Sequence, residues 1–319
     1  MQTYLKTRPV WIQVLLFIGM AFGIVMVISM ITVFIISGMT GLSVLELSNP
    51  ADWDTSKPEM VTYIRAMILA QFLGLFFIPS LLMAYFSDPK PLQYLGLKPL
   101  AKPIYWLLGI GALLLAIPFV DFIGSLNRDM NFGGLQNWAK ELEEEATKTL
   151  QMLLGRNTVP DLLINLLFIA VFAGVGEELF FRGILQRLFI KWTKDPWMGI
   201  VIAAFIFSFF HFQFFGFFPR FLLGILLGAV YWYSGSLWPA IIAHTVYNGF
   251  FIVVAYFNPE MVNNTEASVI DKSNLAWVGF VSAILIGIII WQMKKHSTTT
   301  YEEVYEDDDM KPTEKDLTF

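Results

Sequence analysis

The feature that most constrains the fold is a series of long apolar segments, each close to the roughly 20 residues that a helix needs to cross a lipid bilayer. Eight such segments occupy residues 10–37, 60–86, 104–124, 161–190, 197–215, 218–233, 237–257 and 275–293. Only 15% of the residues are charged, whereas soluble domains carry roughly a quarter. We therefore predict an all-α fold: a polytopic membrane helical bundle of about eight transmembrane helices, embedded in the lipid bilayer and without a nucleic-acid partner.

Basic residues mark one side of this bundle. They lie at the N-terminus, in alternate loops and after the last segment, at Lys6, Arg8, Lys90, Lys98, Lys102, Arg187, Lys191, Lys194, Lys294 and Lys295. Loops with an excess of lysine and arginine stay in the cytoplasm, so both termini are predicted to be cytoplasmic. The chain contains no cysteine, which excludes disulfides, thiolate metal sites and a cysteine nucleophile. This usage fits the cytoplasmic membrane of a bacterium.

Two regions outside the apolar segments have a character of their own. The long connection 125–160 carries apolar residues at helical spacing opposite a charged face, at Trp138, Leu142, Ala146, Leu150 and Leu153. This pattern predicts an amphipathic helix that lies on the outer membrane surface or forms a lid over a cavity. Residues 301–319 hold eight acidic residues and two lysines, which predicts a solvated, disordered tail.

The chain thus divides into five predicted units. They are 1–124 with three N-terminal transmembrane helices, 125–160 with the amphipathic connection, 161–257 with a four-helix catalytic core, 258–293 with a loop and the last transmembrane helix, and 294–319 with the acidic cytoplasmic tail.

Three charged side chains lie inside the apolar segment 161–190, namely Glu177, Glu178 and Arg182. Each costs about 3 kcal/mol in a membrane helix, so the chain keeps them only where partners compensate or a function needs them. The two glutamates point ~100° apart on a helix, and Arg182 follows Glu178 at ion-pair spacing. We predict a structural Glu178–Arg182 pair that leaves Glu177 free to act as a general base in an intramembrane cavity. The alternative is that both carboxylates serve only as ion-pair partners.

Two of the three histidines also lie in apolar segments. His244 and Asn248 are four residues apart and share a helix face. A histidine can orient a water molecule, and an asparagine amide can donate to an oxyanion. His211, placed inside the segment 197–215, is expected to meet them near the bilayer midplane, with Phe207 as a wall of the cavity or as ordinary packing. The simpler alternative for these groups is hydrogen bonding between helices.

Small residues recur at four-residue spacing in two of the segments. The pairs are Gly224 with Gly228 and Ala170 with Gly174, and they predict close helix contacts. Other charged residues near segment ends are expected to extend to the membrane surface, namely Arg65, Asp121 and Arg220.

Together these residues resemble a known family. Three ordered motifs carry the resemblance, namely Glu177-Glu178-x-x-x-Arg182, Phe207-x-x-x-His211 and His244-x-x-x-Asn248. They are similar to those of the CPBP family, which contains the type II CAAX prenyl proteases, bacteriocin-processing enzymes and the "abortive infection" (ABI) membrane proteins. The resemblance covers roughly residues 160–260, about a third of the chain.

The resemblance implies a core of four helices around a membrane-embedded cavity, and a glutamate-dependent intramembrane endopeptidase. It implies that Glu177 activates a water molecule, that His211 positions this water, and that His244 and Asn248 form the oxyanion site. The implied supporting residues are Glu178, Arg182 and Phe207.

No cofactor is predicted. Two histidines and one carboxylate are a ligand set that suits zinc, so Glu177, His211 and His244 would be the ligands of a metal-dependent version of the same protease. The sequence contains no HExxH motif.

The sequence leaves three classes of function to compare. The first is an intramembrane endopeptidase whose partner is a membrane-associated or lipidated peptide or protein. The second is a non-enzymatic bacteriocin-immunity or scaffold protein, for which the intramembrane carboxylates have no evident use. The third is a proton-coupled transporter, which the lack of an internal repeat disfavours.

Overall fold

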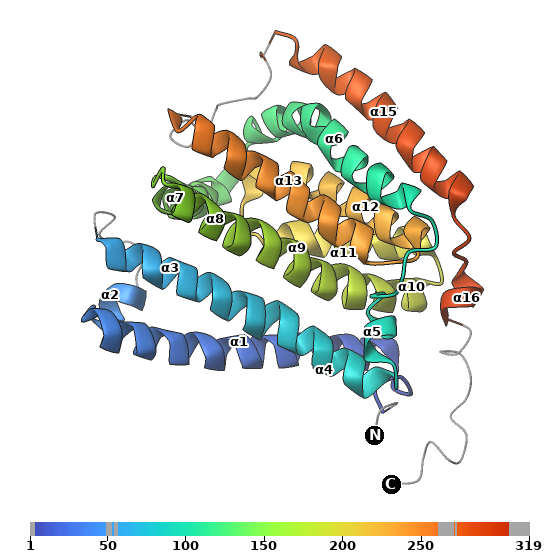
Figure 1. Ribbon diagram of the computed structural model, residues 1–319, viewed down its shortest axis with the longest axis horizontal. Coiled ribbons are helices and arrows are strands. Elements are labelled where there is room, and N and C mark those ends of the chain that lie inside the picture. Colours follow the sequence, from blue (N-terminus) through green and yellow to red (C-terminus); the bar gives the residue numbers. More distant parts are fainter. Residues whose placement is uncertain (1–3, 49–52, 54–56, 261–270, 272, 306–319) are drawn as a thin grey trace.

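The computed structural model of the chain describes residues 4–48, 53, 57–260, 271 and 273–305. Within these residues every regular element is a helix and none is a strand, as Figure 1 shows, so the predicted all-α class is confirmed. The elements are α1 Val10–Thr40, α2 Val44–Ser48, α3 Pro58–Gln71, η2 Phe72–Phe77, α4 Ile78–Ser87, α5 Pro91–Tyr94, α6 Ile104–Arg128, η3 Gly133–Leu135, α7 Gln136–Leu154, α8 Val159–Asn165, η4 Leu166–Val171, α9 Phe172–Glu177, η5 Glu178–Gln186, α10 Arg187–Thr193, α11 Pro196–Phe209, η6 Phe214–Gly216, α12 Phe217–Ser234, α13 Trp238–Phe257, α15 Leu275–His296 and α16 Tyr301–Tyr305.

Two sets of consecutive helical elements each form one continuous rod, and both rods contain π-helical stretches. The first rod joins α3, η2 and α4, and the second joins α8, η4, α9, η5 and α10 without a break. π-Helical turns widen the helix locally and are frequent at functional sites. The second rod carries Glu177 at the end of α9 and both Glu178 and Arg182 in η5.

Among the described residues, seven helices are long and apolar enough to cross a membrane, which makes the chain an integral multi-pass membrane protein. They are Val10–Thr40, Pro58–Ser87, Ile104–Arg128, Val159–Thr193, Phe214–Ser234, Trp238–Phe257 and Leu275–His296. The predicted segment 197–215 differs, because α11 has only 14 residues. At a rise of 1.5 Å per residue it covers ~21 Å of a hydrocarbon core that is ~30 Å thick.

The end of α11 corrects the expected position of His211. Asp195 caps the start of the helix by accepting a hydrogen bond from the Met198 amide at 2.7 Å. The helix ends at Phe209, and Phe212 adopts a left-handed conformation with φ of 52°. His211 therefore lies in a turn between α11 and η6 and not within a transmembrane helix. Irregular backbone at membrane depth is tolerated where it is buried in protein or lines a cavity.

Three apolar clusters hold the helices together. One joins α1 and the rod α3–α4 to η5, α10 and α11, the second joins α6, α12, α13 and α15, and the third joins α1, α2 and α3 to α7. In Figure 1, α1 and α15 lie at opposite edges of the bundle, and the rod α8–α10 lies between them together with α11, α12 and α13. The helices of the predicted 161–257 core are thus enclosed by the flanking ones.

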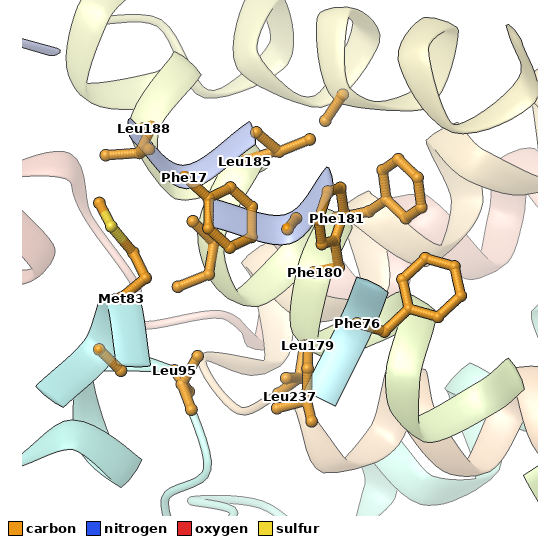
Figure 2. Close-up of a cluster of buried hydrophobic side chains, with 14 of the residues drawn as sticks. Phe17, Phe76, Met83, Leu95, Leu179, Phe180, Phe181, Leu185, Leu188 and Leu237 are labelled. Atoms are coloured by element: carbon orange, nitrogen blue, oxygen red, sulfur yellow. The ribbon is translucent and has the colours of Figure 1, made fainter. Parts of the chain in front are cut away.

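The first cluster fixes the rod that carries the charged residues. Figure 2 shows Phe180 and Phe181 of η5 packed among side chains of α1 and η2. Phe180 lies 4.6 Å from Phe17 between ring centroids and 5.6 Å from Phe76. Between membrane helices such contacts stabilise through close van der Waals packing and not through removal of apolar surface from water, so this face of η5 anchors the opposite, charged face.

The small residues bring helix backbones close together, as their spacing predicts. A Cβ added at Gly224 would lie 2.9 Å from the Ala204 Cβ, and one at Gly228 would lie 2.8 Å from Ile200 Cγ2. This approach also leaves the two glycine carbonyls of α12 accessible to the rod. Arg182 Nη2 donates to the Gly224 carbonyl at 3.0 Å, and Gln186 Nε2 donates to that of Gly228 at 3.1 Å.

The loops that are rich in basic residues meet at one end of the bundle. The Leu237 amide donates to the Gly96 carbonyl at 2.8 Å, and Lys102 Nζ donates to the His296 carbonyl at 2.9 Å. α7 lies at the other end (Figure 1). The side of the membrane on which this end lies stays a prediction.

The acidic tail begins differently from the prediction. Residues 301–305 form the short helix α16, whereas the sequence predicts disorder from residue 301. Tyr305 is buried, and its hydroxyl donates to the Arg187 carbonyl at 2.9 Å. The Arg187 guanidinium lies over the rings of Tyr94 and Tyr305. Residues 306–319 of the predicted tail and 261–270 of the predicted loop lie outside the described residues.

Candidate active site

A cavity of about 140 Å³ lies between the rod, α11, α12, α13 and α6. Its lining contains all four candidate catalytic residues and the candidate wall residue, namely Glu177, His211, His244, Asn248 and Phe207. The remaining lining residues are Leu113, Arg220, Leu223, Leu227 and Tyr247. The structure therefore brings together polar groups that come from three separate sequence motifs.

Glu178 and Arg182 form the ion pair that their spacing predicts. Arg182 Nη1 lies 2.8 Å from Glu178 Oε1, and both side chains are almost fully buried, at 1% and 0% exposure. The same Glu178 oxygen lies 2.9 Å from His244 Nδ1. The carboxylate therefore links the arginine of the rod to the histidine of α13.

This link determines which nitrogen of His244 faces the cavity. A carboxylate only accepts hydrogen bonds, so His244 Nδ1 carries a proton that it donates to Glu178. The other nitrogen, Nε2, lies 3.8 Å from Glu177 Oε2. That distance is longer than a hydrogen bond, and one water molecule can bond to both atoms from the side at about 2.8 Å.

A backbone carbonyl group orients the ring of His211 in a similar way. Its Nδ1 lies 2.8 Å from the Phe207 carbonyl oxygen, and because a carbonyl only accepts, Nδ1 is the protonated nitrogen of the neutral ring. Nε2 is then left as an acceptor. His211 lines the cavity beside Glu177, although its backbone belongs to the turn after α11.

Phe207 packs among the polar residues. Its ring centroid lies 4.6 Å from the Arg182 guanidinium carbon, 4.9 Å from the His211 ring and 6.2 Å from the His244 ring. The ring therefore separates the ion pair from the cavity. Asn248 is one helical turn beyond His244, and its side-chain amide makes no hydrogen bond within the described part of the chain.

Arg220 also lines the cavity, although its position in the sequence predicts a different location for its side chain. Its position near a segment end predicts a side chain that extends to the membrane surface, but the guanidinium lines the cavity. Nη1 donates to Gln213 Oε1 at 2.8 Å, and Nη2 donates to the Gln213 carbonyl. The four-residue spacings that mark the other site residues do not include Arg220, so the sequence offers no local signal for it. Arg65, expected to behave in the same way, instead pairs with Asp161 at 2.8 Å.

A larger groove of about 360 Å³ leads to the same residues from another direction. Glu177 and His211 belong to its lining, and aromatic side chains of η2, η4 and α9 form much of its wall. Ala146, Thr149 and Leu150 of α7 line it as well. The amphipathic helix of the 125–160 connection thus forms part of the wall of the groove that Glu177 also lines.

The contact between α9 and α13 sets the distance between Glu177 and His244, and Gly174 is the residue that permits it. A Cβ there would meet Thr245 Oγ1 and would lie 3.0 Å from the Thr245 amide nitrogen and 3.2 Å from the Ile241 carbonyl. Gly174→Ala is expected to destabilise the protein by about 1–3 kcal/mol, because backbone atoms must move apart. The measurement is unfolding of the purified protein by denaturant.

The matched control for this prediction is Gly249→Ala on the other side of the same interface. Its Cβ would lie 3.5 Å from Leu166 Cδ2, an ordinary contact. We expect that variant to be as stable as the wild type or more so, because alanine favours the helix by about 1 kcal/mol over glycine. Equal losses in the two variants would contradict the prediction.

The donor set does not form a compact metal site. Within the described residues, no group of three His, Asp or Glu side chains is close enough to hold a metal ion. His244 Nδ1 is already bonded to Glu178. Of the three residues of the zinc version, His244 therefore offers Nε2 alone, and Glu177 and His211 line the cavity beside it.

The fold and the site define a polytopic α-helical membrane protein in which a glutamate, two histidines and an asparagine line one cavity between the helices. Residues 159–250 match the family model described as Type II CAAX prenyl endopeptidase Rce1-like. The match covers the motif-bearing rod, α11, α12 and most of α13, so the resemblance to the CPBP and CAAX protease family is confirmed. At the family level, residues 159–250 are similar to a CAAX-protease-like intramembrane peptidase. Neither the curated proteins nor the solved structures include a match to the chain.

Proposed function

We propose that the protein is a glutamate-dependent intramembrane endopeptidase that hydrolyses a peptide bond of a membrane-associated or lipidated protein. The observation that carries the proposal is the 3.8 Å approach of Glu177 Oε2 and His244 Nε2 across a cavity that also contains His211 and Asn248. This arrangement lies within the segment that matches a protease family.

In the proposed reaction Glu177 is the general base. Its carboxylate takes a proton from a water molecule that His211 Nε2 positions as an acceptor, and the water oxygen attacks the peptide carbonyl carbon. Collapse of the tetrahedral intermediate breaks the C–N bond, and the proton passes from Glu177 to the leaving amine. The products are a new carboxylate and a new amine, and no metal or cofactor takes part.

His244 and Asn248 are the proposed oxyanion site. His244 Nδ1–H is held by Glu178, so the ring donates to the oxyanion only when Nε2 is also protonated. The buried Glu178 carboxylate stabilises that imidazolium form. The Asn248 amide is the second donor. Glu178 and Arg182 are therefore positioning residues that act through His244.

We further propose that the chain lies in a bacterial cytoplasmic membrane with both termini in the cytoplasm, and that residues 161–257 act as its catalytic core. In this orientation α7 and the groove are on the outer side. The apolar walls of the groove suit an apolar chain of the substrate, such as a lipid group or a membrane helix.

The direct test uses purified protein in liposomes and a panel of lipidated and unlipidated peptides, with cleavage followed by mass spectrometry in the presence and absence of a chelator. We expect cleavage at one internal bond that continues in chelator. Activity lost in chelator would support the zinc version with Glu177, His211 and His244 as ligands. If no peptide is cut and loss of the protein changes no protein terminus in its native membrane, the proposal is wrong.

Asn248→Ala is expected to lower kcat by about 10²–10³-fold with a much smaller change in KM, because the amide acts on the developing oxyanion and not on the bound substrate. The control is Asn258→Ala, at the exposed end of the same helix. Steady-state kinetics on a cleaved peptide distinguish the two parameters. A change confined to KM would assign Asn248 to substrate binding and contradict the oxyanion role.

A further inference from the structure

The middle of the second membrane span carries a polar side chain that has no partner. Gln71 is the last residue of α3, inside the apolar span Pro58–Ser87, and the π-helical stretch η2 begins at the next residue. The residue is exposed, and its side-chain amide makes no hydrogen bond within the described part of the chain. Side-chain amides in membrane helices commonly bond to a neighbouring helix. The amide of Gln71 is instead free to bond to a ligand.

Gln71 lies at the level of the proposed base. It lines the groove of about 360 Å³ that Glu177 and His211 also line. Gln71 and Glu177 each lie within two residues of the middle of their span. The two spans also touch there, because a Cβ added at Gly176 would be 2.9 Å from Phe72 Cδ2. A ligand bound by the free amide would therefore lie close to the reacting groups.

A second amide in the same groove has one free group. Gln213 lies in the turn after α11 and belongs to the lining. Its Oε1 accepts a hydrogen bond from Arg220 Nη1 at 2.8 Å. Because a guanidinium only donates, this bond identifies the oxygen of the amide and leaves Nε2 as the other group. Nε2 makes no hydrogen bond to any residue that the structure describes, so it remains a donor for a ligand.

The rest of the lining indicates what kind of ligand the two amides bind. The hydroxyl of Thr149 already donates to the Glu145 carbonyl at 2.9 Å, and the other lining residues apart from Glu177 and His211 are apolar. A purely apolar chain would leave both amides without partners. A peptide backbone matches them, because each peptide unit has one N–H donor and one C=O acceptor. At membrane depth these backbone groups need partners whenever they are not in a helix.

We propose that Gln71 and Gln213 bind the backbone of an extended stretch of the substrate next to the bond that is cut. The assignment of this backbone to the substrate rests on the proposed protease function. Gln71 accepts from a substrate N–H through Oε1 and donates from Nε2 to a substrate carbonyl, and Gln213 donates from Nε2 to a second carbonyl. These contacts select an extended conformation and not a sequence, because a helical segment uses the same backbone groups internally.

Binding tests this subsite without any cleavage. The probe is a short fluorescein-labelled peptide of alternating alanine and leucine with an amidated C-terminus. It is compared with the same peptide methylated at every backbone nitrogen, which removes the N–H donors and keeps the side chains. Fluorescence anisotropy gives the Kd of each peptide for the full-length protein with Glu177→Gln, so that neither peptide is cut during the measurement.

We expect the methylated peptide to bind this protein about tenfold more weakly than the unmodified one, because the bond to Gln71 Oε1 is lost in apolar surroundings. Adding Gln71→Met, a side chain of similar shape without the amide, is expected to bring the ratio of the two Kd values to about one. The matched control is Gln292→Met on α15, a helix that supplies none of the described lining residues, and it should keep the tenfold ratio. Equal ratios in all three proteins, or no binding of the unmodified peptide, would overturn the subsite.

The two glutamines are distinguished by their partners. Gln213→Glu keeps an oxygen for Arg220 but has no N–H. It should weaken binding of both peptides by about threefold and leave their ratio unchanged, because Gln213 is assigned to a carbonyl. An unchanged Kd would remove Gln213 from the subsite. Gln71→Met should unfold at no lower a temperature than the wild type, since no bond within the fold is lost, and a clear loss of stability would contradict the free amide.

Kinetics then connect the subsite to the reaction. On a peptide that is cut, Gln71→Met is expected to raise KM by about tenfold with kcat changed by less than about threefold, because the backbone contacts are the same in the bound substrate and in the transition state. An unchanged KM would contradict the role of Gln71 in substrate binding. If no peptide is cut, the proposed protease function fails, while the Kd ratios still decide whether the groove binds a peptide backbone.

Discussion

The Glu177→Gln variant is expected to lose peptide cleavage almost completely, with kcat lowered by at least about 10³-fold. Glutamine has nearly the same shape as glutamate but cannot take a proton from the attacking water. Glu177 lies 3.8 Å from His244 Nε2 and makes no shorter ion pair among the described residues, so the fold should not depend on its charge. Kinetics on a cleaved peptide, with thermal unfolding of the same preparation, provide the measurement.

A matched control separates the loss of the base from the loss of a negative charge. Glu145→Gln removes a carboxylate from an exposed position on α7 and is expected to keep full activity. A Glu177→Gln protein that turns over within a few-fold of the wild type would contradict the general-base role. If the protein is a scaffold or an immunity protein, the same variant should keep its partner binding or protection unchanged, so the experiment also distinguishes those two classes.

The second large effect is expected at the buried ion pair. Arg182→Leu should destabilise the protein by about 3–5 kcal/mol, because it leaves the Glu178 carboxylate buried beside His244 alone. The change also removes the hydrogen bond to the Gly224 carbonyl and the contact with the Phe207 ring. Unfolding in bicelles by denaturant is the measurement. Lys57→Leu is the control, because Lys57 pairs with Glu46 at 2.9 Å with its side chain 41% exposed, and exposed pairs contribute about 0–1 kcal/mol.

A double variant tests whether Glu178 also acts through His244. Glu178→Leu added to Arg182→Leu removes the unpaired charge and is expected to recover part of the lost stability. It should not recover cleavage, because His244 Nδ1 then has no carboxylate to hold its ring and to stabilise the imidazolium. Recovery of both stability and activity would show that Glu178 is only a partner for Arg182. Similar losses of stability in Arg182→Leu and Lys57→Leu would contradict the energetic role of the pair.

The sequence alone is enough to predict features that depend on local periodicity. A rise of 1.5 Å and a turn of ~100° per residue place Arg182 next to Glu178 and Asn248 next to His244 in any helix. Apolar length likewise predicts the long spans, and the four-residue glycine spacing predicts the close approach of α12 to α11. The three motifs in order were enough to indicate the protease family, which the match over residues 159–250 confirms.

Tertiary structure decided the features in which separate segments meet. The early end of α11 after 14 residues moves His211 into a turn, yet the packing of α11 on α12 returns it to the cavity. The same packing turns Arg220 inward, although its position near a span end suggested the membrane surface. Tyr305 is buried against α10 because Arg187 offers it both a carbonyl acceptor and a cation. Helical spacing describes neighbours on one rod, whereas the cavity is formed by long-range contacts whose geometry no local pattern contains.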